Sequence, residues 1–263
     1  MNNIRCNKIV VPSRYIFVIN CISPNLEIIG GEYIDIRDAP YQVSLVNPTG
    51  HYCGGIIVAH DIVITAAHCG VGINLNDFQI RVGSSSSKAG GVLYPIGDVI
   101  VHEGFNWTAL DNDVAVIWLS KSLEFNDRVS SVDMLEENEE IKEGKRAIVT
   151  GWGYTGHVYP EILQRVEVPI VSEESCRNTY SDFKFHVTPR MLCAGISIGG
   201  KDTCNGDSGG PLVYNGKLAG VVSWGKCGES NHPGVYAKVS ALRNWIDDSI
   251  TYIRLKHLMG VQT

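Results

Sequence analysis

The sequence predicts an all-β protein. Short apolar runs recur between clusters of glycine, proline, asparagine and serine, and no internal repeat is present. Regularly spaced short strands bounded by turn residues are typical of a β-sandwich or a β-barrel. With 263 residues, 44% of them hydrophobic, the chain can form one fold or two smaller halves. The predicted strands are 41–46, 56–64, 78–82, 92–101, 114–119, 147–152, 163–171, 212–224 and 234–239.

The overall charge argues against two classes of partner. The formal net charge is −6, which does not favour binding to nucleic acid. The apolar stretches are all shorter than the run needed to cross a bilayer as a helix. We therefore expect neither a nucleic-acid partner nor a membrane partner.

The N-terminal residues have the features of a secretory signal. Arg5, Lys8 and Arg14 make the start of the chain positive, and Tyr15–Ile22 is an apolar stretch of eight residues. That length is at the short end for the core of a signal peptide. We interpret residues 1–23 as a signal peptide and expect a secreted, extracellular protein.

Two of the predicted strands deliver a potential catalytic side chain. Ala66-Ala67-His68-Cys69 follows the apolar run Ile62–Ile64, so His68 stands at the end of a buried strand. Asp113 stands at the head of the strand 114–119. Taken alone, one histidine among eight is more often structural, and an aspartate before a strand is a common turn residue.

Gly206-Asp207-Ser208-Gly209-Gly210-Pro211 is the most informative run of the chain. A serine hydroxyl is a poor nucleophile at neutral pH and needs a base to accept its proton. It also needs N–H groups directed at the oxyanion that its attack creates. Taken alone, such a run is more often an ordinary turn between two strands. The order His, Asp, Ser along the chain, however, is one of the three known orders for a catalytic triad.

Taken together, these motifs resemble a chymotrypsin-fold serine protease of the trypsin-like group, of the invertebrate type with three disulfides. The resemblance runs from about Ile28 to Ile246 and rests on motifs that occur in the right order. They are Ile28-Ile29-Gly30-Gly31, Cys53-Gly54-Gly55, Thr65-Ala66-Ala67-His68-Cys69, Asp113-Val114-Ala115, Gly151-Trp152-Gly153, the Ser208 run, Ser223-Trp224-Gly225 and Pro233-Gly234-Val235-Tyr236.

The resemblance implies an architecture of two six-stranded antiparallel β-barrels, with the active site between them and a C-terminal helix. The protease domain would span residues 28–249. An acidic connector near 133–145 would join the barrels. The helix would start near Ala241, with Trp245 and Ile246 on its apolar side. We expect the C-terminal tail, 250–263, to be frayed.

The resemblance also implies a role for each motif. Ser208 would be the nucleophile, His68 its base, and Asp113 the group that orients the imidazole. The N–H groups of Gly206 and Ser208 would form the oxyanion hole. Substrate-binding residues would be Asp202, Thr203, Ser223, Trp224, Gly225 and Gly234. Asp202, at the floor of the primary pocket, would select Arg or Lys side chains. The rim between Trp224 and Cys227 is one residue shorter than is usual in trypsin, which leaves the strictness of that preference open.

Beyond Cys6 and Cys21, six cysteines remain, and by sequence alone they could pair in fifteen ways. The resemblance selects Cys53–Cys69, Cys176–Cys193 and Cys204–Cys227. Structural disulfides of this kind imply an oxidising compartment.

Activation would follow the zymogen scheme of the family. Residues 24–27 would be a short propeptide, and cleavage before Ile28 would free an amino group that pairs with Asp207. Glu27 precedes that bond, where the family usually has Arg or Lys. We therefore expect a different protease to activate this one.

The remaining expectations concern ligands and partners. Ser84–Lys88 occupies the place where several family members bind calcium and offers no carboxylate, so we expect no metal there and no cofactor. Asn106-Trp107-Thr108 is an N-glycosylation sequon. Expected partners are polypeptide substrates, protein protease inhibitors and an activating protease, and we expect a monomer.

Two alternatives stay open at this stage. The chain could be a protease-fold binding protein without catalytic activity, although all three triad positions are filled. It could also be an active protease of chymotrypsin-like or broad collagen-cutting preference, against which Asp202 argues. The absence of added domains favours a simple digestive type of enzyme.

Overall fold

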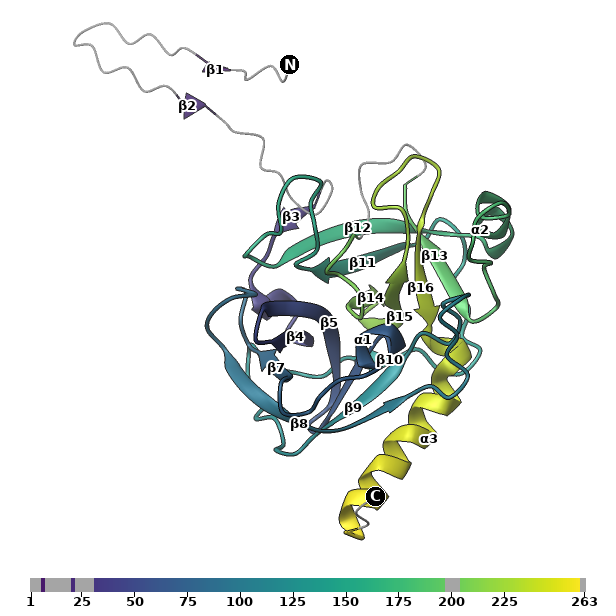
Figure 1. Cartoon of the computed structure of the whole chain (residues 1–263). Helices are drawn as coiled ribbons and strands as arrows, with labels where there is room; N and C mark the ends of the chain where they lie inside the picture. The colour runs from purple at the N-terminus through teal and green to yellow at the C-terminus, as the bar shows by residue number, and fades with distance from the viewer. Residues whose placement is uncertain (1–5, 8–19, 22–30, 197–203, 261–263) are drawn as a thin grey trace, which may run out of the picture.

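The computed structural model describes residues 6–7, 20–21, 31–196 and 204–260. The first of its two barrels is closed, with strand order β4-β5-β6-β9-β8-β7. Neighbouring strands in it run antiparallel, and the strands are drawn in purple to blue in Figure 1. Its strands are β4 (Gln42–Asn47), β5 (Gly50–Ala59), β6 (Ile62–Thr65), β7 (Gln79–Val82), β8 (Val92–Val101) and β9 (Ala115–Leu119).

The second barrel, in green to yellow in Figure 1, also has six strands, in the order β15-β14-β11-β12-β13-β16. It closes because β16 pairs with β15 as well as with β13. Its strands are β11 (Arg146–Gly151), β12 (Gln164–Val171), β13 (Met191–Ala194), β14 (Pro211–Tyr214), β15 (Lys217–Trp224) and β16 (Gly234–Lys238). The two barrels and the C-terminal helix confirm the architecture that the resemblance implied.

Short elements complete the fold. β3 (Glu32–Tyr33) adds to β12, and β10 (Asp133–Met134) pairs in parallel with β15. The remaining elements are β1 (Cys6–Asn7), which pairs with β2 (Asn20–Cys21), the 3-10 turn η2 (Ile36–Asp38), α1 (Ala67–Gly70), α2 (Glu173–Thr179) and α3 (Val239–Leu258). The expected connector near 133–145 leads from β9 towards β11. None of the described helices is both long enough and apolar enough to span a membrane.

Two predicted runs each contain a hairpin instead of one strand. The run 212–224 divides into β14 and β15 at Asn215-Gly216, where both residues have positive φ. Asn-Gly is the strongest sequence signal for such a tight turn. The run 56–64 likewise spans the turn between β5 and β6. β13 is not among the predicted strands, because its apolar run, Met191–Ala194, is only four residues long.

Helix α3 is longer than expected, since it continues through Leu258 where a frayed tail was predicted. Ile246 and Ile253 are fully buried in the apolar core that α3 shares with the first barrel, and Trp245 is half-buried. Further along, Arg254 pairs with Asp61, and His257 stacks on Trp118 with ring centroids 3.8 Å apart. The helix follows the last strand of the second barrel and packs on the first, so it ties the two together (Figure 1).

We expect Ile253→Ala to lower the free energy of unfolding by about 2–5 kcal/mol, because the change leaves a cavity in a fully buried position. Leu258→Ala is the matched control, since that side chain is 82% exposed. Its effect should stay within about 0.5 kcal/mol. Urea unfolding of both variants measures the difference. Equal, small effects would show that the end of α3 does not pack as described.

Candidate active site

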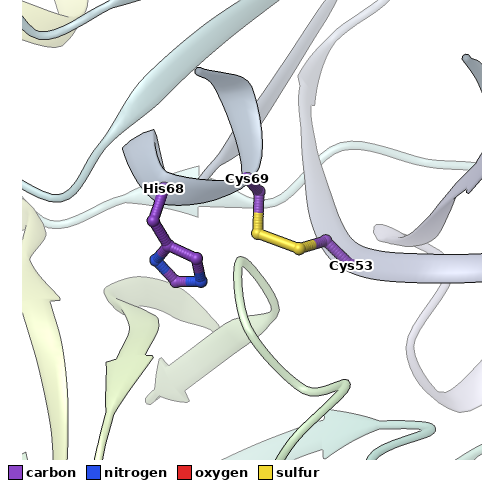
Figure 2. Close-up of side chains that lie close together, drawn as sticks. All are labelled: Cys53, His68 and Cys69. Carbon is purple, nitrogen blue, oxygen red and sulfur yellow. A yellow bond between two sulfur atoms is a disulfide. The ribbon is translucent and has the colours of Figure 1, made fainter. Parts of the chain in front are cut away.

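His68 is held by a short helix that is covalently fixed to the neighbouring strand. β6 ends at Thr65, and α1 begins two residues later with Ala67. Cys69, the residue after His68, forms a disulfide with Cys53 of β5. Figure 2 shows the disulfide on one side of α1 and the imidazole beside it. The position of the histidine is therefore set by the first barrel.

Cys53, His68 and Cys69 also place one potential metal-binding atom each within 4.8 Å of the others. A metal would need the cysteines as thiolates. Here the two sulfurs are bonded to each other, so they cannot supply that charge. We assign this group to the support of His68 and not to a metal centre.

Asp113 is almost completely buried, with 1% of its surface exposed, and accepts three hydrogen bonds. The backbone N–H of His68 donates to Oδ1 of Asp113 at 2.9 Å, and the ring nitrogen Nδ1 of His68 lies 2.7 Å from Oδ2. The hydroxyl of Ser223, from β15, donates to Oδ2 at 2.5 Å. A carboxylate can only accept, so Nδ1 of His68 carries the hydrogen and Nε2 is left as a basic nitrogen.

Ser208 lies in a turn that contacts the strand segment leading to His68. Its carbonyl accepts from the N–H of Gly54 at 2.8 Å. A Cβ on the next residue, Gly209, would lie 2.2 Å from Thr65 Oγ1 and 2.6 Å from Gly54 O. Gly209 also has a φ of 78°, so only glycine fits this position without strain.

The Ser208 hydroxyl makes no hydrogen bond to any residue of the described part of the chain. Catalytic hydrogen bonds are often long without substrate and shorten when it binds. Ser208 also lines a cavity of about 170 Å³. The other lining residues are Cys204, Asn205, Val222, Ser223, Trp224, Gly225 and Cys227.

The backbone of Gly206 is fixed by a histidine that the sequence did not single out. His51 Nε2 lies 2.9 Å from the carbonyl oxygen of Gly206, and His51 Nδ1 lies 2.6 Å from Ser44 Oγ. The carbonyl can only accept, so Nε2 donates and Nδ1 accepts from the serine hydroxyl. Burial lowers the pKa of His51, which opposes protonation of the ring. No spacing or motif in the sequence distinguishes His51 from the other histidines.

Asp207, the residue before Ser208, explains the Gly151-Trp152-Gly153 motif. Its carboxylate is 2% exposed and accepts from the N–H of Gly153 at 2.7 Å and that of Cys204 at 3.0 Å. A Cβ on Gly151 or Gly153 would lie 2.1 or 2.2 Å from a carboxylate oxygen. Both positions therefore require glycine. Ile28, the expected partner of Asp207 after activation, lies outside the described residues.

The expected substrate-binding residues are only partly described. Asp202 and Thr203 lie outside the described ranges. Trp224 ends β15, Gly225 follows it, and Gly234 begins β16. The Cys204–Cys227 disulfide ties the Ser208 loop to the segment after β15.

Lys226, on the shortened rim, has partners on its own loop. Its ammonium lies 3.1 Å from His232 Nε2 and 3.6 Å from Glu229 Oε1. It also lies 5.2 Å from the centre of the Phe183 ring.

The other expected features can be located directly. All three disulfide pairings implied by the resemblance are present. Asn106 is exposed, and its side-chain oxygen accepts from the Thr108 N–H at 2.8 Å and hydroxyl at 2.7 Å. Its glycosylation stays a prediction.

Comparison with known proteins agrees with this geometry. The Trypsin family model matches residues 28–246. The chain is 52% identical over 238 residues to the vitellin-degrading protease of Bombyx mori, covering 89% of this chain and 90% of the relative. It is 40% identical over 233 residues to trypsin of Phaedon cochleariae (86% and 89%) and 41% identical over 223 residues to trypsin delta of Drosophila melanogaster (83% and 87%). The resemblance stated from the motifs is confirmed.

We expect His51→Gln to weaken the dependence of stability on pH. The pKa of His51 in the folded protein lies below the ordinary value near 6.5. Below about pH 6.5 the unfolded chain therefore binds more protons at this site, and the contribution to stability is lost as the pH falls. Urea unfolding at pH 7 and pH 5 should show a smaller loss for the variant than for the wild type. The half-buried ring of His102, whose pKa burial also lowers, is present in both proteins and cancels in the comparison. An equal loss in the two proteins would rule out this role for His51.

Proposed function

We propose that this chain, which belongs to the trypsin family of serine endopeptidases, cleaves polypeptides after Arg or Lys through a Ser208-His68-Asp113 triad. The observation that carries the proposal is the buried Asp113 carboxylate, which accepts from His68 of the first barrel and Ser223 of the second. This arrangement leaves His68 Nε2 as the basic nitrogen, and the turn that holds Ser208 contacts Gly54 and Thr65 of the first barrel.

In the proposed mechanism, Ser208 Oγ attacks the carbonyl carbon of the scissile bond while His68 Nε2 takes its proton. The N–H groups of Gly206 and Ser208 stabilise the oxyanion. The intermediate collapses, the C–N bond breaks, and His68 gives its proton to the leaving amine. A water molecule then repeats the two steps on the acyl-enzyme, releasing the new carboxyl end and restoring Ser208.

The preference for Arg or Lys rests on Asp202 and on the family. A carboxylate at the floor of a narrow pocket favours a cationic side chain, because a charge buried without a partner is costly. The contacts of Lys226 with His232 and Glu229 support the preference, since they give this cation partners on its own loop.

The family supports polypeptide substrates and protein protease inhibitors as partners. We further propose a secreted monomer that is made as a zymogen and activated by another protease. The name of the Bombyx mori relative, a vitellin-degrading protease, makes vitellin a second candidate substrate, beside the dietary protein of a digestive enzyme. The alternative of a binding protein without activity is disfavoured by the family and by the intact set of triad residues.

The test of activity uses the full chain with a site-specific cleavage sequence in place of residues 23–27, processed so that Ile28 becomes the first residue. Chromogenic peptides ending in Arg or Lys should be hydrolysed far faster than those ending in Phe or Leu, because Asp202 selects a cation. Vitellin and casein are compared as protein substrates. Ser208→Ala should abolish hydrolysis. Hydrolysis mainly after Phe or Leu would overturn the specificity, and no hydrolysis by the folded, processed protein would favour a binding protein.

The activation proposal predicts that trypsin does not convert the unmodified precursor, because Glu27 and not Arg or Lys precedes the scissile bond. Glu27→Arg should make that bond sensitive to trypsin. N-terminal sequencing after a timed digestion measures both. Release of Ile28 from the unmodified precursor by trypsin alone would contradict the proposal.

A further inference from the structure

The loop that carries Asp113 has an unusual backbone. Leu110 has a φ of 50° and Asn112 a φ of 55°, so residues on both sides of Asp111 adopt the left-handed conformation. Residues other than glycine adopt it at a cost of about 1 kcal/mol or more each, unless their surroundings stabilise it. Asp113 follows directly, so its direction depends on what holds this loop.

The side chain of Asp111 is held by the opposite barrel. Arg190 Nε donates to Asp111 Oδ1 at 3.1 Å, and Arg190 Nη2 donates to Oδ2. The Thr188 hydroxyl adds a third hydrogen bond to Oδ1 at 2.8 Å. Two parallel bonds from one guanidinium fix the orientation of a carboxylate as well as its position.

Arg190 is itself firmly placed in the second barrel. It directly precedes β13, and its carbonyl accepts from the N–H of Lys238 at the end of β16 at 2.8 Å. The backbone of Asp111 is bonded within the first barrel's loop, where its carbonyl accepts from the Asn106 N–H at 3.2 Å. The pair therefore joins a fixed point of the second barrel to the strained loop of the first.

The surroundings favour a charged pair. Asp111 is 9% exposed. Burial raises its pKa, but the bonds from Arg190 and Thr188 outweigh this effect and the pKa lies below its ordinary value. An exposed ion pair adds little to stability, whereas a partly buried bidentate pair constrains geometry. Elsewhere in the described structure, the Glu173–Arg177 pair of α2 is exposed at both side chains and serves as a comparison.

We propose that Asp111 and Arg190 are positioning residues for catalysis, which hold the loop so that Asp113 meets His68 and Ser223 together. This inference rests on the proposed function, because it assigns the pair a part in the same triad. Neither residue touches the reacting atoms. Their effect on the reaction passes through the direction of the Asp113 carboxylate.

The test compares Arg190→Gln and Asp111→Asn with Arg177→Gln, which removes the exposed pair of α2. Each is made in the full chain processed before Ile28. We expect kcat to fall about tenfold to hundredfold in the first two variants, the range that follows from small misplacement of a catalytic group. KM should change by no more than about twofold, because substrate contacts are intact. Arg190→Lys keeps the charge but not the paired bonds and should recover part of kcat. The double variant should be no worse than the more affected single variant, because both remove one interaction.

Proton NMR and melting temperatures distinguish a positioning role of the Asp111–Arg190 pair from an effect on stability alone. The proton between His68 Nδ1 and Asp113 should give a low-field resonance that shifts or broadens in Arg190→Gln and Asp111→Asn, but not in Arg177→Gln. Variants that melt earlier yet keep the resonance, kcat and its pH profile would overturn the inference. A wild type without activity would contradict the proposed function instead, and the resonance would still decide whether the pair positions Asp113.

Discussion

The arrangement of the site depends on one buried carboxylate that accepts hydrogen bonds from both barrels. Asp113 comes from the first barrel, and its oxygens are occupied by His68 of that barrel and Ser223 of the other. A buried charge is tolerated only where hydrogen bonds replace its water. A shift of one barrel against the other would remove the Ser223 bond and leave Asp113 under-satisfied. The hydrogen bonds from His68 and Ser223 that compensate the charge of Asp113 therefore also fix the position of one barrel relative to the other.

At the same junction, the backbones of the two barrels approach each other so closely that only glycine fits at the points of contact. A Cβ on Gly54 would lie 2.9 Å from the backbone of Gly210, so the Cys-Gly-Gly and Ser-Gly-Gly motifs meet across the two barrels. Gly151 and Gly153 likewise lack the Cβ atoms that would occupy the space of the Asp207 carboxylate. These motifs lie far apart in the sequence but meet in one region, formed by the Ser208 turn and the backbone that it contacts. Helix α3 also connects the two barrels, because it follows the last strand of the second barrel and buries Ile253 against the first.

The strands with long apolar runs and the site residues that lie within motifs could be predicted from the sequence. Asp113, His68 and Ser208 were identifiable only as a set, because they occur in a known triad order within motifs that together resemble the trypsin-like proteases. Arg190, His51 and the end of α3 were not. Arg190 and His51 act through partners about 80 and 155 residues away, respectively, and no local pattern records such contacts. The helix end was missed because Arg254, Lys256 and His257 suggest a solvated tail, whereas Arg254 and Lys256 pair with aspartates of the first barrel and His257 stacks on a tryptophan.

Covalent labelling of the nucleophile tests directly whether His68 and Asp113 activate Ser208. The full chain, processed before Ile28, is treated with an organophosphorus reagent and mapped by mass spectrometry. We expect one adduct, on Ser208, that forms much more slowly in His68→Ala and Asp113→Ala, because the serine then lacks an oriented base. A folded, processed protein that forms no adduct, or forms it on another serine, would show that Ser208 is not the activated nucleophile.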